Sequence, residues 1–277
     1  MTQYLELTLG RLAYDDTGTG PLAVCVPGMG DLRQTYRHLT PPVVAAGYRC
    51  VTLDVRGHGE SSVSWPDYSV AAIGADVIAL VRSLNGGRAV LIGNSMAAGA
   101  AVCAAAEAPD QVAGLILLDP FVRDTAPAWQ MRLLAAALTG PWGAGMWAAY
   151  YGGQFPSAPP ADLAGYQRTL RANLRQPGRL RALRRMITAS KCASEERLAR
   201  VAPMGLPVLV LMGTRDKDFR DPAHEAELVA GRLHGTVRMV AGVGHYPQAE
   251  IPEVVAGVVT DFLRTAIPAP RGEQHGA

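Results

Sequence analysis

Ser95 stands at a position suited to a nucleophile. The segment Leu91-Ile-Gly-Asn-Ser-Met-Ala-Ala-Gly follows an apolar run of strand length and opens an alanine-rich helical pattern. The small residues Gly93 and Ala97 flank Ser95 at the spacing that a sharp strand-to-helix turn requires. Such a turn exposes the serine hydroxyl, and the backbone N–H of Met96, at the helix N-terminus, can stabilise a developing oxyanion. A Gly-x-Ser alone occurs often by chance, so the prediction needs further residues.

An acid and a histidine follow later apolar runs and complete the set of groups that nucleophilic acyl transfer uses. The run at 208–212 continues into Gly213-Thr-Arg-Asp216-Lys-Asp218, and His245 lies in the segment Val243-Gly-His-Tyr-Pro-Gln. A histidine can take the proton of an attacking serine, and a carboxylate can orient the imidazole. Asp216 and Asp218 both lie on the loop that leaves the run, and both are candidates for that carboxylate.

Two glycine-containing loops follow the earlier apolar runs. One is Val26-Pro-Gly-Met-Gly-Asp31 and the other is Asp54-Val-Arg-Gly-His-Gly-Glu-Ser-Ser62. Glycines permit tight turns, and Arg56 can tie neighbouring loops together by charge-assisted hydrogen bonds. Gly28-Met-Gly30 also matches part of a dinucleotide-binding fingerprint. Arg33 occupies its third glycine position, however, where a side chain would crowd the helix against the strand.

Together these segments resemble the α/β-hydrolase family over nearly the whole chain outside residues 122–203. The serine segment is similar to the family's G-x-S-x-G nucleophile elbow, with Ala97 in place of the second glycine. The 54–62 loop resembles the family's D-x-R-G-x-G-x-S loop, and Gly-His245 its G-H loop. Pro27-Gly28 stands where the family usually has His-Gly. The order Ser, Asp, His, each just beyond a strand, is that of the family.

The resemblance implies a role for each of these residues. Ser95 would be the nucleophile, His245 the base and Asp216 the acid, because family members place the acid three residues after the glycine. The backbone N–H groups of Met29 and Met96 would bind the oxyanion.

Three further expectations accompany these roles. Asp218 is then expected to be a solvated loop carboxylate. His58, at a variable position of its loop, is expected to have no catalytic role. No cofactor and no metal is implied.

The elements that must position these residues follow an alternating pattern. Strands are predicted at 5–9, 11–14, 22–26, 48–55, 89–92, 115–119, 208–212 and 237–240, and helices at 32–46, 70–84, 96–106, 223–233 and 254–265. Such alternation implies right-handed crossovers and a mostly parallel sheet flanked by helices, the α/β class. The core is predicted over 1–121 and 204–267, and a flexible tail over 268–277.

Residues 122–203 have helical patterns without a convincing strand, which predicts a helical cap over the carboxyl edge of the sheet. We expect about two of its five prominent aromatic residues to reach a ligand; they are Trp129, Trp142, Trp147, Tyr150 and Tyr151. Seven arginines fall within 167–186. They form either a solvated helical face with long stems over apolar surface, or a surface that attracts an anionic substrate or an acidic carrier.

The composition is that of a globular protein with a sizeable core: 277 residues, 49% hydrophobic and 18% charged. A net charge of +2 indicates neither nucleic acid nor an anionic membrane as partner. We expect no signal peptide, and no uncharged apolar stretch reaches the roughly 18 residues of a membrane span. The four cysteines are widely spaced without a CxxC motif, so we expect them reduced in a cytoplasmic protein.

The predicted function is that of a serine hydrolase. It would cleave a carboxylester, lactone or thioester of a small-molecule acyl substrate through an acyl-enzyme. A serine in place of an aspartate argues against epoxide hydrolases and haloalkane dehalogenases, because serine would form an ether that water cannot release. Carbon–carbon bond hydrolysis, cofactor-free perhydrolysis and ligand binding by a receptor with little turnover remain alternatives.

Overall fold

The computed structural model describes residues 1–268, so the expected flexible tail lies outside the described residues except for Pro268. Its centre is an eight-stranded sheet in the order β1-β2-β4-β3-β5-β6-β7-β8. The strands are β1 Thr2–Leu7, β2 Gly10–Thr17, β3 Leu22–Val26, β4 Arg49–Leu53, β5 Ala89–Asn94, β6 Val112–Leu118, β7 Val208–Gly213 and β8 Thr236–Val240. β1 pairs antiparallel with β2, and β2 pairs antiparallel with β4. The remaining pairings, along β4-β3-β5-β6-β7-β8, are all parallel. The predicted α/β class with a mostly parallel sheet is confirmed.

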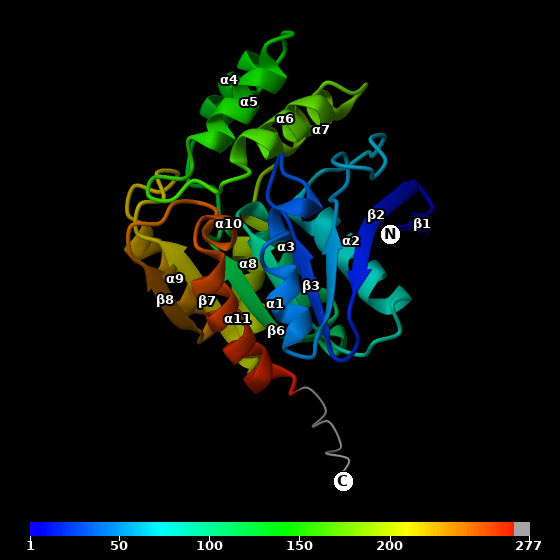
Figure 1. Cartoon of the computed structure of the whole chain (residues 1–277), viewed down its shortest axis with the longest axis vertical. Helices are drawn as coiled ribbons and strands as arrows, with labels where there is room; N and C mark the ends of the chain where they lie inside the picture. The colour runs from blue at the N-terminus through cyan, green and yellow to red at the C-terminus, as the bar shows by residue number, and fades with distance from the viewer. Residues whose placement is uncertain (269–277) are drawn as a thin grey trace.

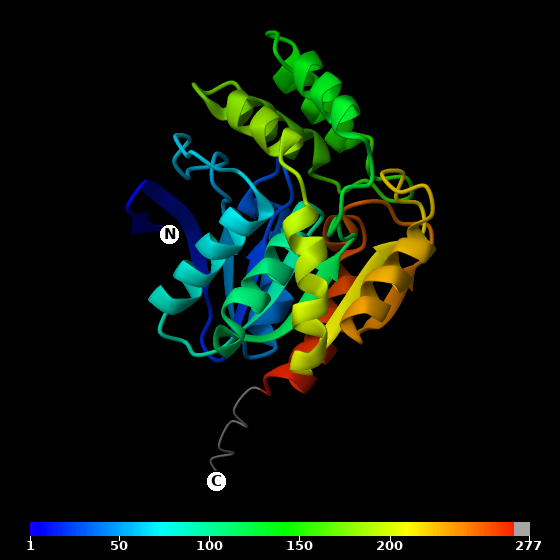
Figure 2. The ribbon, with the colours of Figure 1, turned by 180° about the vertical axis from the view of Figure 1, so that it is seen from behind.

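Helices cover both faces of the sheet, as the uninterrupted apolar strands require. One face carries α2 Val70–Ser83, α3 Met96–Glu107, α8 Cys192–Val201 and α9 Pro222–Leu233, and the other carries α1 Thr40–Ala45 and α11 Pro252–Ala266 (Figure 1, Figure 2). Neighbouring residues of a strand serve opposite faces: Val24 packs in the first core and Cys25 in the second. All four cysteines are free thiols.

The helix predicted over 32–46 is wrong. The chain forms a 3-10 turn, η1 Arg33–Tyr36, and then the short helix α1 Thr40–Ala45. Pro41 and Pro42 explain the break, because a proline has no N–H for the helical hydrogen bond and is tolerated only in a first turn. α1 accordingly begins at Thr40, with the two prolines in its first turn.

The segment between β6 and β7 contains helices and no strand, as the sequence predicts for 122–203. α4 Ala128–Ala137, α5 Gly143–Gly152, α6 Leu163–Leu174 and α7 Arg179–Thr188 form a lobe beyond one end of the sheet (Figure 1). α4 packs against α7 and α5 against α6, while α8 returns to the sheet and packs against α3. Within residues 1–268 no helix is long and apolar enough to cross a membrane.

Most of the seven arginines at 167–186 are exposed, as a solvated face requires, but three of the seven also bind backbone carbonyl groups. Arg179 is buried and donates to the carbonyl oxygen of Ser61. Arg184 donates to the carbonyl oxygen of Ala135 at 2.7 Å, and Arg185 to that of Trp65 at 2.9 Å. These hydrogen bonds tie α7 to the α4 helix and to the loops of the core. The periodicity of the sequence could not indicate these partners, because they lie far away in the chain.

Arg56 ties loops together, as the sequence predicts. Its guanidinium makes two hydrogen bonds of 2.7 Å to the carboxylate of Asp76 on α2 and also donates to the carbonyl oxygens of Asp67 and Ala72. Arg56 and Asp76 are both buried. Two opposite charges satisfied by several hydrogen bonds are tolerated inside a protein, whereas one alone is strongly unfavourable.

We therefore expect Arg56→Met to lower the free energy of unfolding by about 3–5 kcal/mol, because it leaves the Asp76 carboxylate buried without its counter-ion. The double variant Arg56→Met/Asp76→Leu should regain most of that loss, since it removes both charges. Urea unfolding of the parent, single and double variants measures the difference. A double variant no more stable than the single one would contradict this account of the pair.

Candidate active site

Ser95 lies on the turn between β5 and α3 in a strained backbone conformation. Its φ of 58° and ψ of −125° are rare for a residue with a side chain, and such strain persists only where the surroundings enforce it. The N–H of Ser95 donates to the carbonyl oxygen of Leu118 at 2.8 Å. A Cβ atom on Gly93 would lie 2.5 Å from the carbonyl oxygen of Ala97, so the turn requires glycine at that position.

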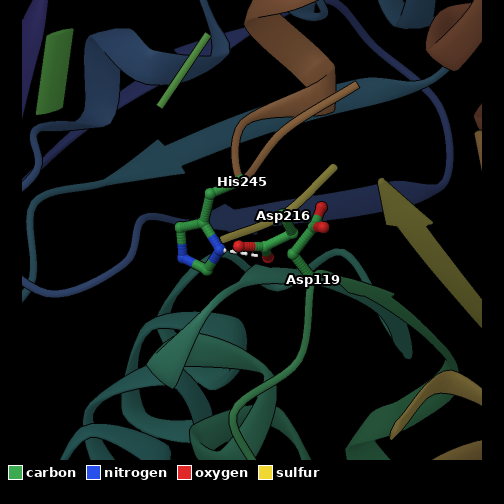
Figure 3. A group of neighbouring side chains, drawn as sticks. All are labelled: Asp119, Asp216 and His245. Carbon is green, nitrogen blue, oxygen red and sulfur yellow. Dashed lines mark hydrogen bonds and ion pairs between the residues drawn. The ribbon is translucent and has the colours of Figure 1, made fainter. Parts of the chain in front are cut away.

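His245 and Asp216 form a buried hydrogen-bonded pair (Figure 3). Asp216 follows β7 and His245 follows β8, and His245 Nδ1 donates to Asp216 Oδ2 at 2.6 Å. This bond leaves His245 Nε2 available as a proton acceptor. The side chain of Asn94, the residue before Ser95, donates to the carbonyl oxygen of His245 at 3.1 Å and so connects the two loops.

The pair holds opposite charges in place. Burial lowers the pKa of His245, but the Asp216 carboxylate outweighs burial and raises the pKa to about 9. Burial alone would raise the pKa of Asp216. The charge and the hydrogen bond of His245 outweigh burial and bring the pKa of Asp216 below its ordinary value. Asp216 is therefore the ionised acceptor of the pair.

Asp218 is not a solvated carboxylate, and that expectation is wrong. Its side chain is only 16% exposed and lies 3.8 Å from His245 Nδ1, farther than Asp216. The hydroxyl of Tyr150 and the side-chain amide of Gln154, which donates at 3.0 Å, bind its oxygens. The α5 helix and the residues just after it cover this loop, and the local sequence around Asp218 carries no sign of that cover.

Asp119 is a further carboxyl group of the site that the sequence reasoning missed. It follows β6 with a φ of 45°, is fully buried, and its Oδ1 accepts the N–H of Gly213 at 2.9 Å. Its carboxyl group lies beside Asp216 (Figure 3). Burial and the charge of Asp216 raise the pKa of Asp119 well above its ordinary value. The available signal was an aspartate at the carboxyl end of an apolar strand, the same kind of position that Asp216 has.

Asp119, Asp216 and His245 offer three potential metal ligands within 4.8 Å of one another. A metal ion needs about 2.0–2.2 Å to each nitrogen or oxygen ligand. The 2.6 Å bond between His245 Nδ1 and Asp216 Oδ2 leaves no space for an ion between those atoms. The geometry is that of a hydrogen-bonded pair with a neighbouring acid.

The loop with Met29 passes directly beside Ser95. A Cβ atom on Gly28 would lie 3.0 Å from the Cβ atom of Ser95. Within residues 1–268 the N–H groups of Met29 and Met96 donate to no protein acceptor. The two predicted oxyanion donors are thus unpaired near the nucleophile.

His58 braces this loop from the neighbouring 54–62 segment. Its Nε2 accepts the N–H of Gly30 at 3.2 Å, and its Nδ1 donates to the carbonyl oxygen of Arg56 at 3.2 Å. Burial lowers the pKa of His58 to about 4, so its ring is neutral near neutral pH. From the lobe, the indole N–H of Trp147 donates to the carbonyl oxygen of Gly30 at 3.0 Å. The backbone N–H and the carbonyl oxygen of Gly30 are therefore both hydrogen-bonded.

A cavity of about 310 Å³ contains Ser95 and His245 in its wall, between the carboxyl edge of the sheet and helices α4 and α5. Most of its remaining wall is apolar and includes Met29, Met96, Phe121, Met131, Leu134, Leu138, Met146 and Trp147. Trp147 and Tyr150 are the two of the five predicted aromatic residues that line it. Trp129 and Trp142 are exposed, and Tyr151 packs against Tyr246.

The chain is similar to known proteins both in sequence and in structure. A sequence model described as the Alpha/beta hydrolase family matches residues 23–258. A 2-(acetamidomethylene)succinate hydrolase of Mesorhizobium japonicum is 25% identical over 93% of this chain and 94% of its own. BpoC of Mycobacterium tuberculosis, a candidate non-heme bromoperoxidase, is 37% identical, but the match covers only 39% of this chain and 41% of that protein. A thermophilic esterase from Thermogutta terrifontis, with malate bound, is 25% identical with a TM-score of 0.77, covering 95% of this chain and 99% of the esterase.

Substitution of Asp119 tests its protonation. Asp119→Asn resembles the protonated acid and should stay within about 1 kcal/mol of the parent at about pH 4, where the carboxyl group is protonated in much of the unfolded chain as well, whereas Asp119→Ala leaves the Gly213 N–H unpaired at a cost of about 1–3 kcal/mol. The folded parent must keep its carboxyl group protonated above about pH 4, where the unfolded chain releases the proton. Relative to the parent, Asp119→Asn should therefore gain stability as pH rises. Urea unfolding across this range measures the gain, and parallel pH profiles would contradict a raised pKa.

Proposed function

The chain belongs to the alpha/beta hydrolase family, and on that premise we propose that it is a serine hydrolase acting on a small-molecule acyl substrate. The bond cleaved is a carboxylester, lactone or thioester. The observation that carries the proposal is the buried His245–Asp216 pair in the wall of the cavity that also contains Ser95. A strained serine, a histidine with a free Nε2 and an ionised acid are the groups that acyl transfer needs.

In the proposed mechanism Ser95 Oγ attacks the substrate carbonyl carbon while His245 Nε2 takes its proton. Asp216 keeps the proton of Nδ1 in place and stabilises the imidazolium that forms. The N–H groups of Met29 and Met96 stabilise the oxyanion, and a single donor of this kind is worth about 10²–10³-fold in rate. His245 then returns the proton to the leaving group. Water, activated by the same histidine, releases the acyl group from Ser95.

Residues 122–203 are proposed to act as a cap over this site. α4 and α5 supply Met131, Leu134, Met146 and Trp147 to the apolar wall of the cavity, which suits the hydrocarbon part of a small substrate. The covering helices also exclude water from the reacting groups, and electrostatic interactions are stronger where water is excluded.

Perhydrolysis is a second candidate, favoured by the 37% identity to BpoC over 39% of this chain. In that reaction hydrogen peroxide replaces water, attacks the acyl group on Ser95 and leaves as a peracid. The same residues serve both reactions. Peracid formation from an ester and hydrogen peroxide, measured through oxidation of bromide, distinguishes the two.

The first test is Ser95→Ala. We expect it to abolish hydrolysis of short p-nitrophenyl esters while the protein stays folded, because the change removes a single oxygen atom from the wall of a cavity. A fluorophosphonate probe should label Ser95 in the parent and nothing in the variant. Substantial turnover by the folded variant, or labelling of another serine, would refute the assignment. Lack of ester turnover by the parent itself would favour a receptor.

The second test compares two isosteric variants. Asp216→Asn should lower kcat by up to about 10⁴-fold, because an amide permits the wrong histidine tautomer. Asp218→Asn should cost far less, since Asp218 lies farther from His245 and is bound by Tyr150 and Gln154. Both variants are measured on one activated ester.

The pH dependence separates the two aspartates further. His245 must be neutral to act as a base, so kcat/KM of the parent should rise with pH towards about 9. Loss of the Asp216 charge removes the main cause of the raised pKa, so the rise in Asp216→Asn should move to lower pH. A greater loss in Asp218→Asn than in Asp216→Asn would reassign the acid.

A further inference from the structure

Lys191 is a buried cation in the wall of the cavity. It immediately precedes α8, is only 8% exposed, and is the one lysine among lining residues that include no arginine. A buried ammonium is unfavourable unless an anion or several hydrogen-bond acceptors replace its water. Lys191 thus needs a partner, and its surroundings decide whether the protein supplies one.

Asp124 is the nearest anion, but it satisfies Lys191 poorly. Its Oδ1 lies 3.8 Å from Lys191 Nζ, beyond hydrogen-bond distance. The carboxylate already accepts the hydroxyl of Ser190 at 2.5 Å and the backbone N–H of Lys191 at 3.0 Å, and it is 41% exposed to solvent. Within residues 1–268 no side chain or carbonyl oxygen accepts a hydrogen bond from Nζ. The donors of the ammonium are available to a ligand.

Phe121 connects Lys191 with the reacting groups. The ring of Phe121 lies 6.0 Å from Lys191 Nζ and 5.8 Å from the ring of His245. The N–H of Phe121 donates to the carbonyl oxygen of Ser95 at 3.1 Å. A substrate whose carbonyl carbon lies at Ser95 can therefore extend along Phe121 and reach the ammonium.

The wall also contains two carboxylates that could compete with a ligand anion for Lys191. Asp218 is already bound by Tyr150 and Gln154, and Asp124 lies 3.8 Å from Lys191 Nζ and is 41% exposed. The seven arginines at 167–186 do not line the cavity, which argues against them as direct ligands of an anionic substrate. One ammonium in an otherwise largely apolar space of about 310 Å³ suits one negative charge on a small molecule.

We propose that Lys191 binds a free carboxylate of the substrate, so that the substrate class is an ester-type compound carrying a second, unesterified carboxylate. This inference rests on the proposed hydrolase function and refines it. Burial lowers the pKa of Lys191, with Asp124 opposing the shift, and a bound carboxylate would favour the charged ammonium. A doubly charged phosphate would require more donors than this wall offers.

The test compares anionic and neutral esters of matched size. One pair carries the charge on the acyl side: the mono-p-nitrophenyl ester of adipic acid against the p-nitrophenyl ester of a neutral branched acid of equal length. The other carries it on the leaving group: p-acetoxybenzoate against p-isopropylphenyl acetate. The quantity measured is the ratio of kcat/KM for the anionic ester to that for the neutral ester. A general loss of activity cancels in this ratio.

In Lys191→Met the ratio should fall about 10- to 100-fold in one of the two pairs, the usual worth of a charge-assisted hydrogen bond. Lys191→Arg should retain most of the preference for the anionic ester. If Lys191→Met disturbs folding, Lys191→Gln replaces it in the test and should lose the preference as well. Arg181→Met is the matched control, because it removes a positive charge from α7 outside the cavity. A fall of less than about fivefold in both pairs, or an equal fall in the control, would overturn the proposal.

A binding experiment separates this proposal from the hydrolase function. Monomethyl adipate is titrated by calorimetry into Ser95→Ala and into Ser95→Ala/Lys191→Met. Both titrations measure binding and do not depend on turnover. The double variant should bind at least about 10-fold more weakly. Equal affinities would refute the role of Lys191 even if Ser95 proves to be the nucleophile. Turnover by Ser95→Ala would refute the nucleophile and leave the binding comparison valid.

Discussion

Parallel pairing of β5, β6, β7 and β8 is the constraint on which the site depends. Asn94 lies opposite Leu118, and Leu118 opposite Leu211, so Ser95, Asp119 and the loop with Asp216 all begin at one edge of the sheet. Because parallel strands end together, residues from distant parts of the chain meet there without any long-range motif. A change of register at any of these pairings would move a whole loop relative to the others.

This convergence has an electrostatic consequence. Asp119 and Asp216 lie close together and are both buried, and two negative charges so placed are strongly unfavourable. His245 supports the charge of Asp216, whereas Asp119 accepts the N–H of Gly213. The two chemically identical side chains therefore differ in pKa: burial and the charge of Asp216 raise the pKa of Asp119, whereas His245 holds the pKa of Asp216 below its ordinary value.

Sequence reasoning succeeded where the signal was local. The strand run before Ser95, the small residues around it and the loops with Asp216 and His245 each carry their own pattern, and the structure brings their residues to one cavity. It failed where the outcome depended on distant neighbours. Neither the α5 cover of Asp218 nor the proximity of Asp119 to Asp216 is written in the surrounding residues. The helix predicted across Pro41 and Pro42 is wrong for a different reason: the apolar pattern suits a helix, but the two prolines lack the N–H groups that helical hydrogen bonds need.

The hydrogen bond from Trp147 to Gly30 couples the lobe to the nucleophile's surroundings. Trp147 belongs to α5, and Gly30 adjoins Met29, whose N–H faces the reacting carbonyl in the proposed mechanism. If α4 and α5 moved away to admit a substrate, the indole would release the carbonyl oxygen of Gly30, and the N–H of Gly30 would keep its hydrogen bond to His58. The position of the Met29 N–H would therefore depend on how α5 lies over the sheet, and not on the core alone.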